Sequence, residues 1–320
     1  MRTKLKGKIL FVFSDPGGAK PCLSLIEENN LSNVIAVSDR RYSFYHSFKT
    51  PVKIVNKNFE ELIKIINPEL IFTGTSYTSN IEQQFINIAL KNRIRCYSFI
   101  DHWTSISKRF KNLDGKMILP DQVWVIDERA KQLAIEEGID KDRLVISGNP
   151  YHDWLLNWKP TINREAFFKQ VGLQHINQKI LVYAPDPLSN VKGKEVFGFD
   201  ELSATSVLVE LFKKYPTKLK GWKILVKAHP NQDRDKLNKI IERHKTFYIL
   251  PEEVDINLAL FYADAVIGFF SSVLIEATIM NKPVLRFLDG LTKNDPIVGL
   301  NVGMITNRNT FITMLSKITL

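Results

Sequence analysis

Cysteine is scarce in this sequence, and the compositional marks of several protein classes are missing. Cys22 and Cys96 are too few for a disulfide framework, and each lies in an apolar stretch, which predicts reduced, buried thiols and a cytosolic protein. The 15 glycines and 14 prolines among 320 residues exclude collagen-like repeats and low-complexity disorder. No apolar run approaches the roughly 18 residues that a membrane-spanning helix needs.

The N-terminus is basic, like the start of a signal peptide, but the apolar run behind it is short. That run covers residues 9–13 and stops at Ser14, Asp15 and Pro16. We therefore expect a strand there rather than a signal sequence.

The formal charge of +10 comes from 44 Lys and Arg against 34 Asp and Glu, and it is spread along the chain. A nucleic-acid binder usually concentrates its positive charge on one helix or stripe, so we expect no nucleic-acid partner. Phosphorylated ligands or the anionic inner membrane suit an even surplus better.

Short β-branched apolar runs alternate with amphipathic stretches along the whole chain. This alternation predicts an α/β protein with two Rossmann-like parallel-sheet domains and an interdomain cleft. A breaker cluster at residues 148–150 ends the first series, so we place the domains at 1–150 and 151–320, with residues 151–158 as a linker. Functional residues are expected just after strands, where parallel sheets bind their ligands.

The strongest constellation lies at residues 268–272 (GFFSS), where an apolar strand meets a serine pair that opens a helix. Ser271 or Ser272 can cap this helix, and its free N–H groups and dipole would bind a phosphate. Glu276 follows one turn later on the same face, where it can accept hydrogen bonds from a ribose. The alternative is a plain serine cap with a surface glutamate.

A second constellation is His229-Pro230, which directly follows an apolar strand. A histidine at that edge can donate a hydrogen bond or a proton to a departing phosphate oxygen. Pro185 and Asp186 follow the first strand of the same half and can form the other wall of a nucleotide pocket, although Asp186 is equally suited to a turn.

In the first half, Asp15, Gly17 and Gly18 lie between a strand and a helix start, which predicts a glycine turn that a ligand can approach closely. The run is neither a Walker loop nor a complete G-x-G-x-x-G fingerprint, so ATP hydrolysis and nicotinamide chemistry lose their main support.

Asp101 and His102 end another strand of the first half, and Lys108 and Arg109 follow. A carboxylate there can act as the general base for an acceptor hydroxyl, so Asp101 is the first choice, with His102 and Asp15 as rivals. Lys108 and Arg109 can bind an anionic acceptor, although such a run is more often a solvated face.

The His-Pro and Ser-Ser pairs, in this order, resemble the motifs of bacterial GT-B glycosyltransferases that use CMP-activated sialic acid and related nonulosonic or ulosonic acids, including capsule polysialyltransferases. The resemblance implies that His229, Ser271 and Ser272 hold the donor phosphate. Those families commonly take their base from an acidic pair followed by glycine, whereas this chain has Asp101-His102-Trp103 at the comparable strand.

The resemblance extends more loosely to polyol-phosphate transferases that use CDP-glycerol and to sugar-nucleotide 2-epimerases. The epimerases typically carry Asp-Ser-Gly-Gly where this chain has Phe-Phe-Ser-Ser, which counts against them.

We therefore expect a metal-independent glycosyltransferase of polysaccharide biosynthesis that moves a sialic-acid-like sugar from a CMP donor to a hydroxyl of a bacterial surface glycan. Residues 1–150 would bind the acceptor and residues 151–320 the CMP-sugar, which is a co-substrate; no cofactor is expected. The alternatives are a 2-epimerase, a CDP-polyol phosphotransferase and a catalytically inactive binding module. The expected location is the cytoplasm, with the positive surplus favouring peripheral contact with the inner membrane.

Overall fold

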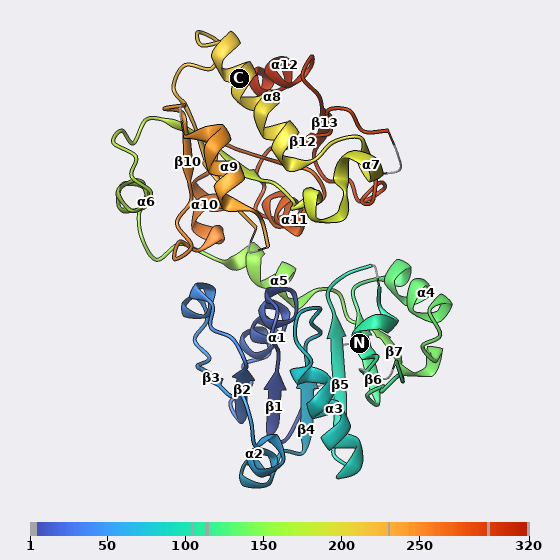
Figure 1. Cartoon of the computed structure of the whole chain (residues 1–320). Helices are drawn as coiled ribbons and strands as arrows, with labels where there is room; N and C mark the ends of the chain where they lie inside the picture. Colours follow the sequence, from blue (N-terminus) through green and yellow to red (C-terminus); the bar gives the residue numbers. More distant parts are fainter. Residues whose placement is uncertain are drawn as a thin grey trace. The chain divides into compact units, whose positions relative to one another are not determined.

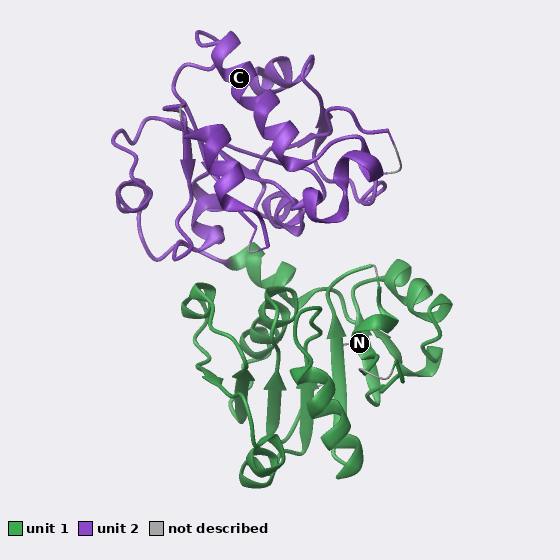
Figure 2. Ribbon diagram, in the orientation of Figure 1, with its two compact units in different colours: residues 1–157 green, residues 158–320 purple. Residues whose placement is uncertain are grey.

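The computed structural model describes residues 5–103, 105–112, 115–229, 231–242, 244–292 and 295–318. The chain divides into two units, unit 1 (Met1–Asn157) and unit 2 (Trp158–Leu320) (Figure 2). Helix α5 (Pro150–Asn157) was expected to be part of a linker, but it belongs to unit 1 because it packs against α1 (Pro16–Glu28). The boundary therefore follows Asn157 rather than residue 150.

Unit 1 is built on a parallel sheet with the strand order β3-β2-β1-β4-β5-β6-β7 within the described residues (Figure 1). Its strands are β1 (Ile9–Val12), β2 (Val34–Ser38), β3 (Val52–Ile54), β4 (Leu70–Thr73), β5 (Arg95–Ile100), β6 (Gln122–Val125) and β7 (Leu144–Ile146). Its other helices are α2 (Phe59–Ile66), α3 (Ile81–Lys91), α4 (Glu128–Glu136) and the short 3-10 turns η1 (Ser43–Ser47), η2 (Ser107–Phe110) and η3 (Lys141–Arg143). The order of the strands reverses between β1 and β4, so the switch point of the sheet lies there.

Strand β1, in the centre of the unit 1 sheet, is apolar throughout because helices cover both faces of the sheet. In β1, Leu10 and Val12 belong to the core beneath α2, α3 and α4. Phe11 projects from the other face and contacts Phe72 of β4, with ring centroids 5.2 Å apart. Because these strands pair in parallel, the carboxyl ends of β1, β4 and β5 lie at one edge of the sheet.

Unit 2 has a second parallel sheet, with the order β10-β9-β8-β11-β12-β13 among the described residues. Its strands are β8 (Lys179–Ala184), β9 (Trp222–Val226), β10 (Phe247–Ile249), β11 (Ala265–Gly268), β12 (Val284–Phe287) and β13 (Met304–Thr306). Its helices are α6 (Arg164–Gln170), α7 (Gly193–Phe197), α8 (Glu201–Lys214), α9 (Arg234–Ile241), α10 (Ile256–Tyr262), α11 (Ser272–Ile279), α12 (Phe311–Lys317) and the 3-10 turn η4 (Leu188–Val191). Helices α8, α9 and α12 pack on one face, and α6, α10 and α11 on the other. Here the switch point lies between β8 and β11.

The two Rossmann-like parallel-sheet units confirm the fold class predicted from the sequence. Several helix starts differ from the prediction. The apolar pattern predicts a helix only over residues 23–28, but α1 begins at Pro16, so Gly17 and Gly18 lie in its first turn and not in a glycine turn. The same pattern predicts a helix over residues 204–214, but α8 begins at Glu201, because Asp200 and Ser203 form a reciprocal capping box. The sequence pattern did not predict α6, α7 or β13.

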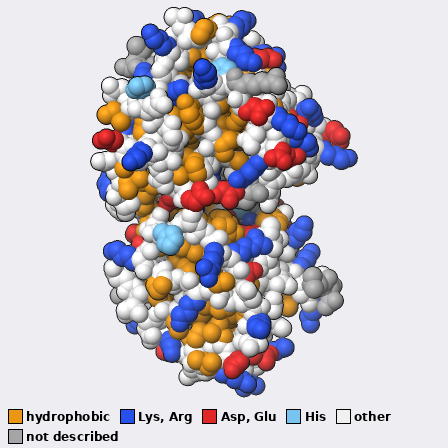
Figure 3. Space-filling model, turned by 60° about the vertical axis from the view of Figure 1, so that its left-hand side comes forward, with side chains coloured by type: hydrophobic (Ala, Val, Ile, Leu, Met, Phe, Trp, Pro, Cys, Tyr) orange, Lys and Arg blue, Asp and Glu red, His pale blue; other side chains and the backbone are white. Residues whose placement is uncertain are grey.

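Both cysteines are buried and free, as predicted. No helix among the described residues is long and apolar enough to cross a membrane. On the face shown in Figure 3, Lys and Arg side chains are scattered rather than gathered in one patch, with Asp and Glu among them.

Candidate functional site

Three neighbouring strands of unit 2, β9, β8 and β11, deliver their loops to one edge of the sheet. The loop after β8 is hydrogen-bonded to both of the others. The Asp186 carboxylate accepts from the Phe270 backbone N–H at 2.9 Å, and the Asn190 side-chain amide donates to the Asn231 carbonyl oxygen at 2.7 Å. The loops that carry His229, Asp186 and the serine pair therefore meet at the switch point of this sheet.

His229 lies beyond β9 with an exposed side chain, and hydrogen bonds within its loop fix its backbone and the orientation of its ring. Its backbone N–H donates to Gln232 Oε1, and its Nδ1 accepts from the Asn231 N–H, both at 3.1 Å. Because Nδ1 accepts, the neutral ring carries its proton on Nε2. Partial burial, with a contribution from Lys227, lowers the pKa of His229 below its ordinary value, so the neutral ring predominates at pH 7. Pro230, its predicted partner, lies outside the described residues.

The serine pair opens α11 as the sequence predicts. Ser271 is the N-cap in an extended conformation, and its hydroxyl oxygen accepts from the Val273 N–H at 3.3 Å. Ser272 is exposed, whereas Pro185 is buried behind the loop. The start of α11 thus offers hydroxyl groups and one end of a helix dipole to an anion.

Asp186 lies at the start of α11, and its carboxylate already accepts a hydrogen bond there. Burial raises the pKa of Asp186 to about 6, although N–H groups of Phe270 and Ser271 and the charge of Arg286 favour its ionised form. An incoming phosphate would therefore meet a negative charge beside the donors of the serine loop. Glu276, the predicted ribose ligand, is buried, with 5% of its surface exposed.

Arg286 is a site residue that the sequence analysis missed. It is 3% exposed, donates through Nε to the Phe269 carbonyl at 3.0 Å and forms a bidentate ion pair with Asp295. It therefore fixes the loop that leads to the serine pair. A charged residue inside the apolar strand 284–287 was the available signal, because such a charge is seldom buried without a partner.

In unit 1, the Asp15 carboxylate is engaged by backbone and side-chain groups of nearby loops. Its carboxylate accepts from the Tyr77 N–H at 2.7 Å and from the Thr78 hydroxyl at 2.5 Å, and it pairs with Arg40 at 3.3 Å. These contacts tie the loop after β1 to the loop after β4. The arrangement favours a positioning role over proton abstraction, because the carboxylate oxygens are already engaged.

Asp101 and Arg109, predicted separately as base and acceptor ligand, form one ion pair. Arg109 is 7% exposed, and its guanidinium donates to Asp101 Oδ1 at 2.9 Å and to the Thr75 hydroxyl at 3.0 Å. Arg109 therefore does not belong to the solvated face that the sequence allowed, whereas Lys108 is exposed. A Cβ at Gly17 would lie 2.0 Å from Asp101 Oδ2, so a larger residue there would displace this carboxylate from its present position.

Gly18 allows the start of α1 to lie close to the backbone that follows β4. A Cβ at this position would lie 2.8 Å from the Thr75 backbone nitrogen and 3.1 Å from the Gly74 Cα. The glycines let α1 begin directly against β4 and Asp101, which accounts for their place in the helix.

His102 follows Asp101 and is partly buried. Burial lowers its pKa, with Arg109 acting in the same direction and Asp101 against it. A neutral imidazole can accept a proton, so His102 is compatible with the base role for which it was considered.

Glu82, in the first turn of α3, is a second residue that the sequence analysis missed. It is 2% exposed, accepts from the Ser14 N–H at 2.9 Å and also bonds to the Ser76 hydroxyl. Burial, with the nearby charge of Asp15, raises the pKa of Glu82 to about 7. Its side chain joins the loops after β1 and β4 at the switch point of unit 1.

No group of three or more His, Cys, Asp and Glu side chains among the described residues is arranged to hold a metal ion.

A family model described as CDP-glycerol:poly(glycerophosphate) glycerophosphotransferase matches residues 128–294, which are 167 of the 320 residues. The matched range contains all the donor-binding residues predicted for unit 2: Pro185, Asp186, His229, Pro230, Ser271, Ser272 and Glu276. No curated protein matches the sequence.

Solved structures share the fold at low sequence identity. UDP-GlcNAc 2-epimerase from Neisseria meningitidis, bound to UDP-GlcNAc, is 14% identical with a TM-score of 0.69; the match covers 97% of this chain and 90% of that one. The Methanocaldococcus jannaschii UDP-GlcNAc 2-epimerase is 14% identical with a TM-score of 0.66, covering 97% and 91%. Anabaena Alr3699/HepE in complex with UDP-glucose is 17% identical with a TM-score of 0.63, covering 98% and 92%. At such identities the likeness concerns the fold alone.

Proposed function

Because the chain belongs to the CDP-glycerol:poly(glycerophosphate) glycerophosphotransferase family, we propose that it transfers a polyol phosphate from a CDP-activated donor to a hydroxyl of a phosphate-linked polymer. This activity was one of the alternatives that the sequence left open. The family match supports it over transfer of a sialic-acid-like sugar from CMP and over 2-epimerisation. Unit 2 would bind the donor and unit 1 the acceptor, at the cytoplasmic side of the inner membrane.

The observation that carries the proposal is the meeting of the loops after β9, β8 and β11 at one edge of unit 2. Asp186 and Asn190 join these loops by hydrogen bonds of 2.9 and 2.7 Å. A neutral imidazole and the start of a helix thereby face the same edge, and both can donate hydrogen bonds to phosphate oxygens.

The proposed reaction is a phosphoryl transfer. The acceptor hydroxyl oxygen forms a bond to the phosphorus that bears the polyol, the bond from that phosphorus to the oxygen of CMP breaks, and CMP leaves with the electron pair. His229 Nε2–H donates to the leaving phosphate, while Ser271 and Ser272 hold its neighbouring oxygens. Donors fixed before the reaction stabilise charge on these oxygens without reorganising, which is the largest contribution in reactions of this kind.

The acceptor proton needs a base, and the carboxyl edge of unit 1 supplies the candidates. The oxygens of Asp15 are engaged by the loop after β4. Asp101 remains our first proposal, with Arg109 paired to its Oδ1, and His102 is the rival because burial lowers the pKa of its ring. Comparing Asp101→Asn with His102→Gln separates them, since only loss of the true base abolishes transfer while leaving donor binding intact.

The proposal is tested by release of CMP from CDP-glycerol in the presence of a poly(glycerophosphate) acceptor. His229→Ala should lower kcat by about 10²–10³-fold, the cost of losing one preorganised donor. His175→Ala is the matched control, because this exposed histidine of unit 2 lies before β8, at the other end of the sheet. Equal turnover of the two variants would refute the assigned role of His229.

A further inference from the structure

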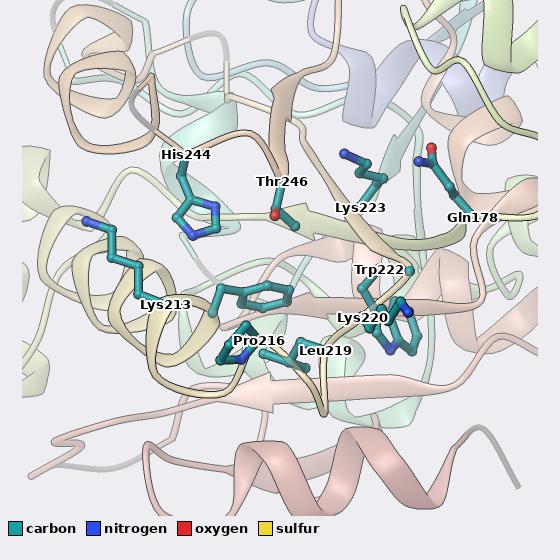
Figure 4. A pocket seen from close by; sticks show the side chains of 11 residues that line it. Gln178, Lys213, Pro216, Leu219, Lys220, Trp222, Lys223, His244 and Thr246 are labelled. Atoms are coloured by element: carbon teal, nitrogen blue, oxygen red, sulfur yellow. The ribbon is translucent and has the colours of Figure 1, made fainter.

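The amino-terminal edge of the unit 2 sheet carries a pocket of about 420 Å³. The last turn of α8, the loop that follows it and the starts of β9 and β10 form its walls. In Figure 4, Lys213 and His244 lie on one side of the pocket, and Lys220, Trp222 and Gln178 lie on the other. None of these residues belongs to the donor site proposed above.

The pocket is strongly basic. Three lysines and His244 line it, and no acidic residue does. Residues 211–232 contain six lysines and no Asp or Glu, a local concentration that the even overall charge concealed. Lys223 is held in the wall, because its ammonium group donates to the Lys245 carbonyl at 3.0 Å and to the Tyr248 hydroxyl at 3.2 Å. Lys213 and Lys220 are exposed at the mouth and can turn toward a ligand.

Two polar atoms in the wall are buried without a hydrogen-bond partner among the described residues, His244 Nδ1 and Gln178 Oε1. Buried polar atoms normally have partners, so a pair of them in one pocket indicates that a ligand supplies them. A neutral imidazole in its Nδ1–H tautomer donates at Nδ1, and rotation of the Gln178 amide presents its NH₂ group instead. Burial and the charges of Lys213 and Lys223 lower the pKa of His244, as a positive potential within the pocket would.

Aromatic side chains complete the wall. Phe212 and Trp222 are 4% and 6% exposed, and the Lys179 ammonium lies 5.8 Å from the Trp222 ring centroid. These rings fix the shape of the pocket and exclude water from one side of it. Charge interactions beside such a wall are stronger than on an open surface.

We propose that this pocket is a second anion site, separate from the donor site, that binds a phosphate ester. Lys213, Lys220 and His244 would contact the phosphate, and the aromatic wall would contact the organic group that it carries. Strand β9 separates the two sites: it rises about 13 Å from Trp222 to Val226, and His229 lies beyond it. The inference goes beyond the proposed function and does not depend on it.

The same phosphate chemistry occurs in soluble esters and in lipid headgroups. A recessed pocket admits a protruding phosphate, so we assign it to a soluble ester such as glycerol 3-phosphate. Vesicles of phosphatidylglycerol provide the contrasting source in the experiment.

The experiment titrates the full chain with glycerol 3-phosphate and with inorganic phosphate, followed by ³¹P NMR, while CDP at saturating concentration fills the donor site. We expect binding to persist under CDP and to weaken at least about tenfold in the double variant K213A/K220A. The control K169A/K239A removes the same charge from exposed positions of unit 2 outside the pocket and should bind as the unaltered chain does. His244→Gln should weaken binding while retaining a side chain of similar reach.

Loss of phosphate binding once CDP is present would overturn the inference, as would equal weakening in both double variants or binding of vesicles alone. Turnover of CDP-glycerol, measured on the same proteins, tests the donor site separately. K213A/K220A should retain it, so failure of the second site and failure of the proposed function are distinguishable.

Discussion

Asp186 and the backbone N–H of Phe270, 2.9 Å apart, join the two loops that flank the switch point of unit 2. The carboxylate holds the serine loop in place and also puts a negative charge beside the groups proposed to bind the donor phosphates. It therefore stabilises the loop at a cost in anion affinity.

Asp186→Asn separates these two effects, because the amide oxygen can still accept from Phe270 while the charge is removed. The pKa of Asp186 is raised to about 6, so its carboxyl is largely ionised at pH 7.5 and largely protonated at pH 5. We expect the variant to lower the donor KM about threefold at pH 7.5 and to leave it nearly unchanged at pH 5. Asp186→Ala, which also loses the acceptor, should raise the KM; equal effects of the two variants would contradict this account.

Substitution of Arg286 tests whether its ion pair with Asp295 stabilises the serine loop. Their side chains are only 4% and 11% exposed, so Arg286→Met removes the ion-pair partner of Asp295 and the side-chain donor to the Phe269 carbonyl. We expect a loss of about 3–5 kcal/mol in the free energy of unfolding, measured by urea denaturation.

The matched control is Arg308→Met, since Arg308 also pairs with an aspartate, Asp289, but is 57% exposed. Its loss of stability should be clearly smaller than that of Arg286→Met. Similar losses for the two arginines would show that Arg286 is not the buried support described here.

Glu82 predicts a specific dependence of stability on pH. Because its folded pKa, about 7, lies above the ordinary value of 4.5, the folded chain binds the proton more tightly than the unfolded chain. Its contribution to stability is therefore complete below pH 4.5 and is lost as the pH rises through 7. Glu82→Gln lacks this titration, so between pH 4.5 and 8 its stability should improve relative to the unaltered chain by about 3 kcal/mol.

Urea denaturation at both pH values measures this shift. Glu60→Gln, an exposed glutamate in the first turn of α2, should show no comparable change. If the difference in stability between Glu82→Gln and the unaltered chain does not change with pH, the Glu82 carboxyl titrates as it does in water.

The strand-end residues could be predicted because a parallel sheet gathers the ends of its strands at one edge. His229 and Ser271 each follow a short apolar run, and the alternation predicted that both lie at the carboxyl edge of one parallel sheet. The start of α1 could not be predicted, because glycine is a poor helix former and Gly17 and Gly18 are accepted only for their close approach to Asp101 and Thr75.

Ion pairs between loops have no characteristic spacing in the sequence, so they could not be predicted from it. Arg109 was expected in solvent or on an anionic acceptor, yet it is buried against Asp101 and Thr75. The basic pocket was not predicted, for a related reason. Gln178, Lys213 and His244 belong to three segments that only the sheet brings together.

Product analysis by ³¹P NMR after separate incubations with CDP-glycerol, CMP-sialic acid and UDP-GlcNAc, each with a poly(glycerophosphate) acceptor, distinguishes polyol-phosphate transfer from the other activities. We expect only CDP-glycerol to be consumed, with CMP and a new phosphodiester formed in equal amounts and both lost in His229→Ala. Transfer from CMP-sialic acid, or conversion of UDP-GlcNAc without use of the acceptor, would contradict this expectation.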